Sequence, residues 1–330
     1  MMTSRERVTA AIEFASPDLV PFTHVLFAGA LWRHGSKLVD LMARYPDDFG
    51  NRNFTIPLEP AEETIDYTDE WGSRWRRRRD YSAGEVIAPA LDSWDKWPSF
   101  AFPADPPAAA FTSYKDSLVG HDWYELSGWF DLYERMQYLR GTENILCDIA
   151  EDRAEIYELA DRLVERNLRL IDRHLECGID GLWLSDDWGT QNGLLISPDR
   201  WRAIFKPRYR RLIEPIKNAG VHVFFHSCGW TEAIWDDLIE LGVDAINIQT
   251  PLMPPDLVRE KLTGRICIFT DVDRQRIMPF GTPQQVRAHI RDLIALCGTP
   301  TGGVMLRGEL EAVWPYENIE AMYQAYAEFR

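Results

Sequence analysis

The stretches GLWLSDDWGT (residues 181–190), VHVFFHSCG (221–229) and AINIQT (245–250) decide the fold, because each is a short apolar run that ends in polar residues. Five such runs are predicted to be strands: Gly181–Ser185, Val221–His226, Ala245–Gln249, Ile266–Thr270 and Gly303–Leu306. The segments between them are typical of helices: Pro198–Ala219, Thr231–Leu241, Pro255–Leu262 and Pro283–Leu296, with a last helix after Pro315. Short strands that alternate with helices predict a parallel sheet with right-handed crossovers. Strands that are apolar throughout indicate a sheet covered on both faces.

Polar residues follow every one of these strands. They are Asp186-Asp187, His226-Ser227-Cys228, Gln249-Thr250, Asp271-Val272-Asp273 and Arg307-Gly308-Glu309. A barrel of parallel strands builds its active site from residues at the carboxyl ends of those strands. No glycine-rich dinucleotide-binding motif follows any strand, which disfavours a Rossmann fold. We therefore predict an α/β protein with a TIM-type (β/α)8 barrel.

The first half of the chain is less regular. Ser4–Phe14 is predicted to be a helix with Ser4 as its N-cap, and Asp18–Val25 is predicted to be the first strand. Residues 28–118 are rich in Trp, Arg, Pro and Asp and have weak periodicity. We predict that they form an N-terminal insertion over the barrel mouth, with Asp69–Arg79 as one strand of a hairpin. No repeat or linker is visible, so residues 1–330 are predicted to form a single domain.

The composition excludes several classes of protein. Of the 330 residues, 45 % are apolar and 27 % are charged, which is typical of a packed globular chain and not of a disordered, fibrous or disulfide-stapled one. The net charge of −16 argues against nucleic-acid binding, and the basic run Arg76–Arg79 is expected to be a solvated face. No apolar run approaches the roughly 20 residues of a membrane helix, and Met1–Val8 lacks the apolar core of a signal peptide. We expect a cytoplasmic location.

The cysteines and tryptophans are the two residue types whose roles the composition raises. The five cysteines are Cys147, Cys177, Cys228, Cys267 and Cys297, and we expect all but Cys228 to be buried, reduced thiols. Thirteen tryptophans are an unusual number for a chain of this length. They either fill the core or line a pocket for a flat organic ligand.

The pair His226 and Cys228 is the strongest local motif. Residues two apart on an extended strand point the same way, and imidazole and thiolate are both good zinc ligands. A buried, hydrogen-bonded histidine beside a packed cysteine explains the pair equally well. A third ligand must come from elsewhere: Glu309 is the nearest candidate, and Glu311 and Gln249 are the other oxygen donors close by in the barrel order.

Other polar residues at the strand ends are candidates for catalysis and substrate binding. Asp186 and Asp187 are predicted to be catalytic, because adjacent carboxylates can raise one another's pKa for acid/base chemistry. They could equally hold a helix N-terminus or a buried arginine. Asp271 and Asp273 could bind substrate or cap the following helix. The residues predicted to bind substrate are Gln191, Gln249, Asp271 and Arg307.

Many short motifs resemble those of the uroporphyrinogen decarboxylase (URO-D) superfamily, and they extend over nearly the whole chain. The similar stretches are Ser4–Val8, Ser16–Pro21, Glu70–Gly72, Leu139–Gly141, Asp186–Gln191, Ile196–Pro198, Lys206–Tyr209, His226–Gly229, Gly281–Pro283 and Pro315–Ile319. The resemblance implies a distorted TIM barrel. True decarboxylases of the family carry an arginine-rich N-terminal motif, whereas the segment Phe22–Gly29 contains no arginine. The chain is more similar to the branch that contains corrinoid-dependent methyltransferases.

This resemblance implies a function, a metal and a partner. Members of the branch move methyl groups between a corrinoid protein and either small methylated compounds, including aryl methyl ethers (O-demethylation), or thiol and folate acceptors. The resemblance implies zinc on His226 and Cys228, with Glu309 where the family often has a cysteine, and methylcobalamin or a related corrinoid on a partner protein. It leaves homo-oligomerisation open. The alternatives are a decarboxylase or lyase for a small carboxylated substrate, with Arg307 as its contact, and a non-catalytic binding barrel.

Overall fold

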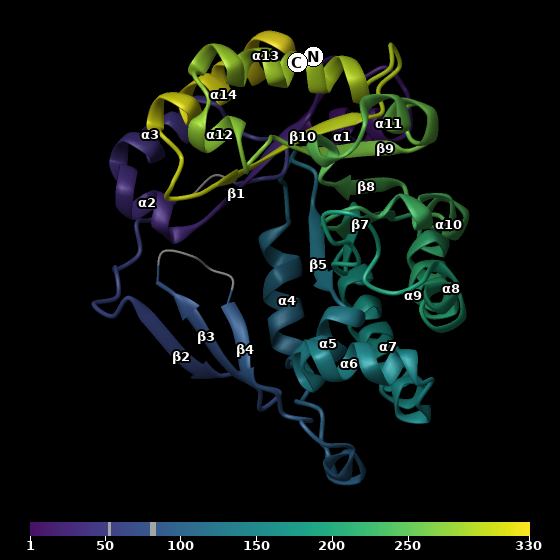
Figure 1. The fold of residues 1–330 in the computed structure, drawn as a ribbon. Helices are drawn as coiled ribbons and strands as arrows, with labels where there is room; N and C mark the ends of the chain where they lie inside the picture. The colour runs from purple at the N-terminus through teal and green to yellow at the C-terminus, as the bar shows by residue number, and fades with distance from the viewer. Residues whose placement is uncertain (52–53, 80–83) are drawn as a thin grey trace.

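The computed structural model describes residues 1–51, 54–79 and 84–330. Within them, seven parallel strands form one curled sheet in the order β1-β10-β9-β8-β7-β6-β5 (Figure 1). The strands are β1 (Phe22–Leu26), β5 (Leu126–Phe130), β6 (Gly181–Ser185), β7 (His222–Ser227), β8 (Ala245–Ile248), β9 (Cys267–Asp271) and β10 (Val304–Leu310). The sheet is TIM-barrel-like, and the five strands predicted in the second half are confirmed as β6 to β10.

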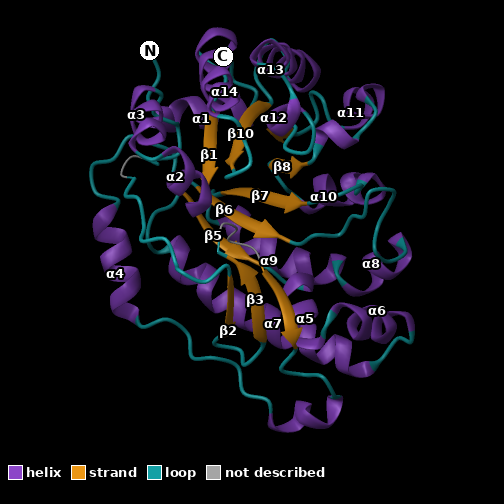
Figure 2. Ribbon diagram, turned by 60° about the vertical axis from the view of Figure 1, so that its left-hand side comes forward, coloured by secondary structure: helices purple, strands orange, loops and turns teal. Residues whose placement is uncertain are grey.

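Helices surround the outside of this sheet (Figure 2). In the first half they are α1 (Ser4–Ile12), α2 (Ala28–His34), α3 (Ser36–Arg44), α4 (Ala108–Ser117), α5 (Tyr133–Arg140), α6 (Thr142–Ala150) and α7 (Ala154–Leu175). In the second half they are α8 (Pro198–Ile204), α9 (Lys206–Asn218), α10 (Trp235–Leu241), α11 (Pro255–Lys261), α12 (Ile277–Phe280), α13 (Pro283–Cys297) and α14 (Tyr316–Phe329).

The predicted barrel of eight strands needs correction. The described residues contribute seven strands to the curled sheet, and no pairing between its edge strands β1 and β5 is found among them. The chain between these two strands instead forms a separate antiparallel sheet of β2 (Thr64–Thr68), β3 (Arg74–Arg78) and β4 (Gly84–Ala88). The described residues of this segment therefore supply no eighth parallel strand, and they leave the curl open between β1 and β5.

The small antiparallel sheet packs on α5. Trp75 lies edge-on to Tyr138 of α5 with 4.7 Å between ring centroids, and the Ser73 hydroxyl donates to the Tyr138 carbonyl at 2.9 Å. Strand β3 confirms the strand expected within Asp69–Arg79. Its residue Arg76 forms a bidentate pair with Asp66 and is half exposed, as expected of a solvated face. The boundaries of the insertion at residues 28 and 118, its place over the mouth and the single domain stay predictions.

Two predicted helices differ from those observed. The predicted helix Pro198–Ala219 is two helices, because α8 ends before Pro207, which lacks an N–H group to continue the ladder and instead occupies the first turn of α9. The N-cap of α1 is Thr3 and not Ser4. The Thr3 hydroxyl accepts from the Glu6 N–H at 3.2 Å while the Glu6 carboxylate accepts from the Thr3 N–H at 2.8 Å, which is a capping box.

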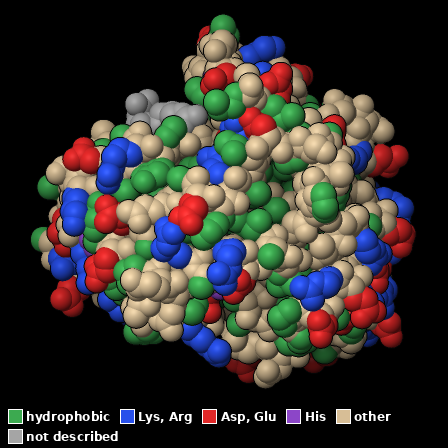
Figure 3. Space-filling model, turned by 90° about the horizontal axis from the view of Figure 1, so that it is seen from above, with side chains coloured by type: hydrophobic (Ala, Val, Ile, Leu, Met, Phe, Trp, Pro, Cys, Tyr) green, Lys and Arg blue, Asp and Glu red, His purple; other side chains and the backbone are tan. Residues whose placement is uncertain are grey.

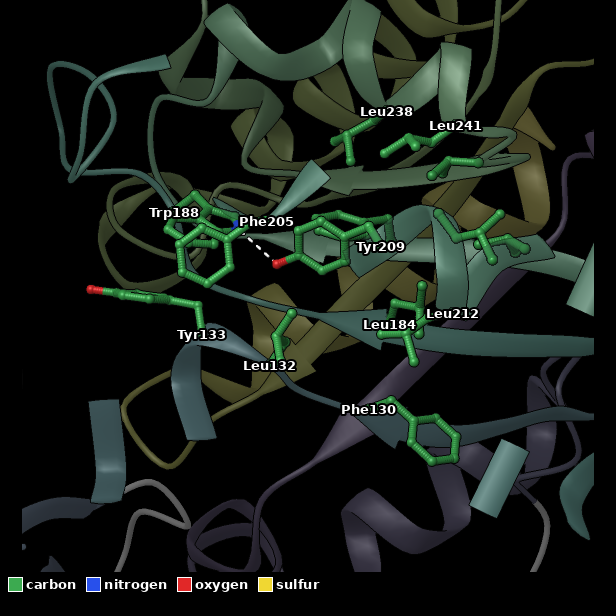
Figure 4. Close-up of a cluster of buried hydrophobic side chains, with 14 of the residues drawn as sticks. Phe130, Leu132, Tyr133, Leu184, Trp188, Phe205, Tyr209, Leu212, Leu238 and Leu241 are labelled. Carbon is green, nitrogen blue, oxygen red and sulfur yellow. Dashed lines mark hydrogen bonds between the residues drawn. The ribbon is translucent and has the colours of Figure 1, made fainter. Parts of the chain in front are cut away.

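Most tryptophans prove to be core residues. Four of them, Trp188, Trp201, Trp235 and Trp314, are fully buried. Figure 4 shows part of this core, in which Trp188 lies beside Phe205 and Tyr133. Cys177, Cys267 and Cys297 are buried free thiols as expected, whereas Cys147 is exposed, which corrects the prediction that it is buried.

The described surface mixes charges of both signs. Figure 3 shows Lys and Arg side chains interspersed with Asp and Glu on one face, with hydrophobic side chains gathered between them. The excess of acidic residues is therefore not arranged on this face as one block. No helix among residues 1–51, 54–79 and 84–330 has the length and apolar character needed to cross a membrane.

Candidate functional site

Three potential metal ligands meet at the carboxyl ends of β6 and β7. His226 is the penultimate residue of β7, Cys228 lies just beyond that strand, and Asp187 lies two residues beyond β6. His226 Nε2 is 3.3 Å from Cys228 Sγ and 3.3 Å from Asp187 Oδ1, and all three donor atoms lie within 4.8 Å of one another. The two-residue spacing therefore brings imidazole and sulfur together as predicted.

This set of donor atoms fits a zinc ion. Zinc is bound by nitrogen, sulfur and carboxylate oxygen at about 2.0–2.3 Å, so a tetrahedral arrangement separates the ligand atoms by roughly 3.3–3.7 Å. The two separations of 3.3 Å around His226 Nε2 match that spacing. Three protein ligands leave a fourth position for a substrate atom, which is typical of catalytic zinc sites.

Asn247 fixes the orientation of the His226 ring. The Asn247 amide nitrogen donates to the Phe269 carbonyl at 2.5 Å, so its amide oxygen faces His226 Nδ1 at 2.6 Å and accepts from it. With its proton on Nδ1, the neutral ring presents the lone pair of Nε2 toward Cys228 and Asp187. A partner of this kind on the second ring nitrogen is what orients histidine ligands in metal sites.

The cluster is strongly coupled electrostatically. Burial opposes a positive charge on His226, but the Cys228 sulfur and the Asp187 carboxylate outweigh it and raise the pKa of His226 well above its usual value. Burial likewise opposes the negative charge on Asp187, but hydrogen bonding and attraction from His226 lower the pKa of that carboxyl to about 2. Without a metal the histidine is thus held as a cation beside the Asp187 carboxylate, and a metal cation would replace its proton.

Two loops hold Asp187 beside Cys228. The Gly189 N–H donates to the Cys228 carbonyl at 3.1 Å, and the Cys228 N–H donates to Asp187 Oδ1 at 2.8 Å. Gly229 has φ +76°, and a Cβ atom there would lie 2.3 Å from the backbone of Gly189. Only glycine allows the loops after β6 and β7 to cross this closely.

One amide group and one guanidinium group contact the Cys228 sulfur in addition to His226. Gln249 Nε2 and Arg274 Nη2 each lie 3.5 Å from Cys228 Sγ, and the Gln249 amide oxygen accepts from the Gly229 N–H at 3.0 Å. The sulfur therefore has one amide and one guanidinium nitrogen as neighbours. Gln249, predicted to bind substrate, therefore contacts the sulfur directly.

Glu309 is engaged by two arginines. One carboxylate oxygen accepts from Arg307 at 2.6 Å and the other from Arg274, and Arg274 also contacts Cys228. A guanidinium group therefore bridges Glu309 and the sulfur. The structure brings Asp187, predicted as a catalytic carboxylate, into the metal-ligand cluster. Glu309 as third ligand stays a prediction from the sequence, and Asp187 is the alternative third ligand that the cluster offers.

Asp186 is a buried hydrogen-bond acceptor. It has no exposed surface and accepts hydrogen bonds from the N–H groups of Leu132 (3.1 Å) and Glu134 (2.7 Å) and from the Tyr209 hydroxyl (2.5 Å). Trp188 in turn donates its indole N–H to Tyr209 (Figure 4). Of the two alternatives for Asp186, these contacts favour the one that holds a helix N-terminus, which is that of α5.

Glu134, which the sequence analysis missed, is a second titratable carboxyl in the site. It accepts hydrogen bonds from the hydroxyl groups of Tyr138 at 2.8 Å and Ser185 at 3.3 Å. Burial, reinforced by repulsion from Asp187, raises its pKa to about 7. The only available signal was its position in the first turn of the helix that follows β5, and that strand was not predicted.

Two cavities flank the cluster. One of about 270 Å³ is lined by polar residues that include Gln191, Gln249 and Asp271. The other, of about 430 Å³, is lined by aromatic residues and by Arg307. Asp273 accepts from the N–H groups of Gln275 and Arg276 in the loop before α12, whose N-cap residue is Arg276. Substrate binding and helix capping by Asp273 stay predictions.

Comparison with known proteins places the chain in a family. Among solved structures, a methyltransferase from Methanosarcina mazei matches over 100 % of this chain and 99 % of its own, with a TM-score of 0.72 and 16 % identity. An endo-β-1,4-xylanase from Gloeophyllum trabeum matches more weakly, over 96 % and 98 % of the two chains, with a TM-score of 0.45 and 11 % identity. No curated protein sequence matches significantly. The model of the uroporphyrinogen decarboxylase (URO-D) family matches residues 133–329, more than half of the chain, and the protein therefore belongs to that family.

Proposed function

We propose that this protein is a zinc-dependent methyltransferase that moves a methyl group between a small methylated substrate, or a thiol or folate acceptor, and a corrinoid carried by a partner protein. The observation that carries the proposal is the cluster of Asp187, His226 and Cys228, whose donor atoms have the chemistry and spacing of a zinc site. The fold similarity to a methyltransferase and the membership of the URO-D family support it.

Asp187, His226 and Cys228 would hold the zinc ion. When bound, zinc supplies Lewis acidity, which polarises an ether oxygen or lowers the pKa of a thiol. The chain itself contributes orientation. Asn247 fixes the imidazole at 2.6 Å, and the crossing loops at Gly189 and Gly229 keep Asp187 against the Cys228 N–H.

The remaining groups control charge and protons around the transferred methyl group. Arg274 and Gln249 stabilise negative charge on the sulfur from 3.5 Å. Glu134, with a pKa of about 7, is about half protonated at neutral pH, and in its protonated form it would deliver a proton to a leaving oxygen. Methyl transfer depends mainly on in-line approach in a dry pocket, and the aromatic cavity beside His226 provides such a surface.

A decarboxylase or lyase acting on a small carboxylated substrate is the second candidate. It is favoured by Arg307, which lines the aromatic cavity. However, Arg307 already binds Asp271 at 2.8 Å and Glu309 at 2.6 Å, so a substrate carboxylate would have to displace one of them. This competition makes methyl transfer the better-supported function.

Methyl transfer to free cob(I)alamin tests the proposal. The zinc-loaded protein is mixed with cob(I)alamin and a panel of methylated compounds (methoxyarenes, methylamines and methylthiols), and methylcobalamin is followed by its absorbance. We expect zinc-dependent formation of methylcobalamin with one class of donor, loss of activity in Cys228→Ser, and normal activity in Cys147→Ser, which changes an exposed cysteine on α6. Activity that is unaffected by zinc removal and by Cys228→Ser would contradict it.

A further inference from the structure

The aromatic cavity occupies the side on which the curled sheet stays open. Both edge strands line it: β1 through residues 23–26 and β5 through Leu126, Gly128 and Trp129. Phe49 and Phe54 come from the segment that follows β1 along the chain, and Trp183 and Phe269 come from β6 and β9. The volume of about 430 Å³ is large enough for a substrate of one aromatic ring.

A bulge in β5 aims Trp129 at this cavity. Ser127 pairs with Leu182 and Phe130 with Leu184, so Gly128 and Trp129 together oppose Trp183 alone. Gly128 has φ +73°, a conformation that favours glycine. A bulge of this kind re-aims the side chain of the bulged residue. Here it lays the Trp129 ring on Trp183, with centroids 5.4 Å apart and an interplanar angle of 13°.

Trp129 is a large apolar surface that the protein leaves uncovered. The residue is 55 % exposed although it lines a cavity, whereas Trp183 beneath it is only 5 % exposed. A stacked pair of Phe49 and Phe269, 5.6 Å apart with an interplanar angle of 11°, contributes further aromatic wall. An exposed indole over a hollow lined with aromatic rings is typical of a site that stacks a flat ligand.

The same indole connects the cavity to the proposed metal site. The Trp129 ring lies 5.8 Å from the His226 ring, and the Trp183 ring lies 6.3 Å from it. A ring stacked on Trp129 therefore lies next to the histidine of the cluster.

The charge of the cavity is balanced. Arg307 is the single Lys, Arg, Asp or Glu side chain among the described residues that line it. Arg307 is 5 % exposed and is bound by the carboxylates of Asp271 and Glu309, at 2.8 and 2.6 Å. Arg274 balances the second of these carboxylates. A ligand carboxylate would meet no uncompensated positive charge from these residues, and burying an unpaired carboxylate costs several kcal/mol.

We propose that the cavity between β1 and β5 binds an uncharged, flat aromatic molecule by stacking it on Trp129, and that it discriminates against aromatic carboxylates. An aromatic ligand is compatible with the proposed methyl transfer if the ring carries the methyl group as an ether. Binding to the cavity does not itself depend on that transfer.

Binding of two matched probes tests this assignment. Isothermal titration with 2-methoxyphenol and with 4-hydroxy-3-methoxybenzoate, which adds a carboxylate to the same ring, should give at least tenfold tighter binding of the uncharged probe. Trp129→Ala should weaken that binding at least tenfold. Phe280→Ala, which removes an aromatic side chain that is 84 % exposed and lies outside the cavity, should leave it unchanged.

A charge variant provides an independent readout. Asp271→Asn removes one of the two carboxylates on Arg307 and should narrow the preference for the uncharged probe or reverse it, because the guanidinium then carries uncompensated charge. If this variant does not fold, two results still test the assignment: the preference of the wild type for the uncharged probe, and the binding of that probe by Trp129→Ala. Equal or tighter binding of the carboxylate by the wild type, or normal binding by Trp129→Ala, overturns the assignment.

The two proposals fail in different ways. Tight binding of 2-methoxyphenol without any methyl transfer to cob(I)alamin would support the cavity assignment and contradict the proposed function. Zinc-dependent methyl transfer from an aliphatic or carboxylated donor would support the function and overturn the cavity assignment.

Discussion

Replacing Asn247 by alanine should weaken zinc binding without changing any ligand. Asn247 is fully buried and links two groups: its oxygen accepts from His226 Nδ1 at 2.6 Å, and its nitrogen donates to the Phe269 carbonyl at 2.5 Å. Loss of the partner that orients a histidine ligand typically lowers metal affinity about 10–100-fold. That factor corresponds to about 1.4–2.8 kcal/mol of binding free energy.

The same substitution should also lower stability. It leaves the His226 N–H and the Phe269 carbonyl without a partner in the interior, and each buried unsatisfied group costs about 1–3 kcal/mol. Asn318→Ala is the matched control. Asn318 is equally buried and donates to the carbonyls of Met278 and Gly281 at 2.9 and 2.8 Å, at a place outside the metal cluster.

The assay is competition with a chromophoric zinc chelator at fixed pH, combined with urea denaturation of the metal-free proteins. Both variants should lose a similar free energy of unfolding, but only Asn247→Ala should lose zinc affinity. A folded Asn247→Ala protein that binds zinc within twofold of the wild type would refute the reasoning, because the tautomer of His226 would then not depend on Asn247.

Three further predictions concern stability. Asp186→Ala should lower the free energy of unfolding by about 3 kcal/mol or more in urea denaturation, because two N–H groups and the Tyr209 hydroxyl lose a buried acceptor; a loss below about 1 kcal/mol would contradict its role as an anchor. The folded-state pKa of Glu134 is raised from 4.5 to about 7, so its contribution to stability is complete below pH 4.5 and is lost as the pH rises to 7. Relative to Glu134→Gln, the wild type should lose up to about 3 kcal/mol over that range, and parallel stability curves for the two proteins would show that the pKa is not raised. Thr3→Ala removes the capping box of α1 and should cost about 1 kcal/mol, whereas an unchanged melting temperature would mean that the end of the helix does not contribute.

Regular strand–helix units were predictable because their patterns are local. Strands β6 to β10 are short apolar runs followed by polar residues, and that pattern was enough to place all five of them. Strand β5 was missed because its sequence carries Gly128 and a partly exposed Trp129 at a bulge, which breaks the apolar run. The same bulge creates the aromatic face of the cavity, so the strand that was hardest to predict carries a functional feature.

The candidate site was predictable only where its residues are close together in the sequence. The pairing of His226 with Cys228 follows from the two-residue period of a strand, and it was predicted. The place of Asp187 beside them depends on the crossing of two loops at Gly189 and Gly229, which are 40 residues apart in the sequence. Glu309 was the nearest oxygen donor in the barrel order. Its partner Arg274 could not be foreseen, because Arg274 reaches it from a loop after β9.

Zinc content tests the central claim most directly. The purified protein is incubated with zinc, freed of unbound metal by gel filtration and measured by elemental analysis, together with the variants Cys228→Ser, Asp187→Asn and Glu309→Gln. We expect stoichiometric zinc in the wild type and in Glu309→Gln, and a large loss in the other two variants. Wild-type protein that retains no zinc after loading, or Cys228→Ser protein that keeps it fully, would contradict the proposed metal centre.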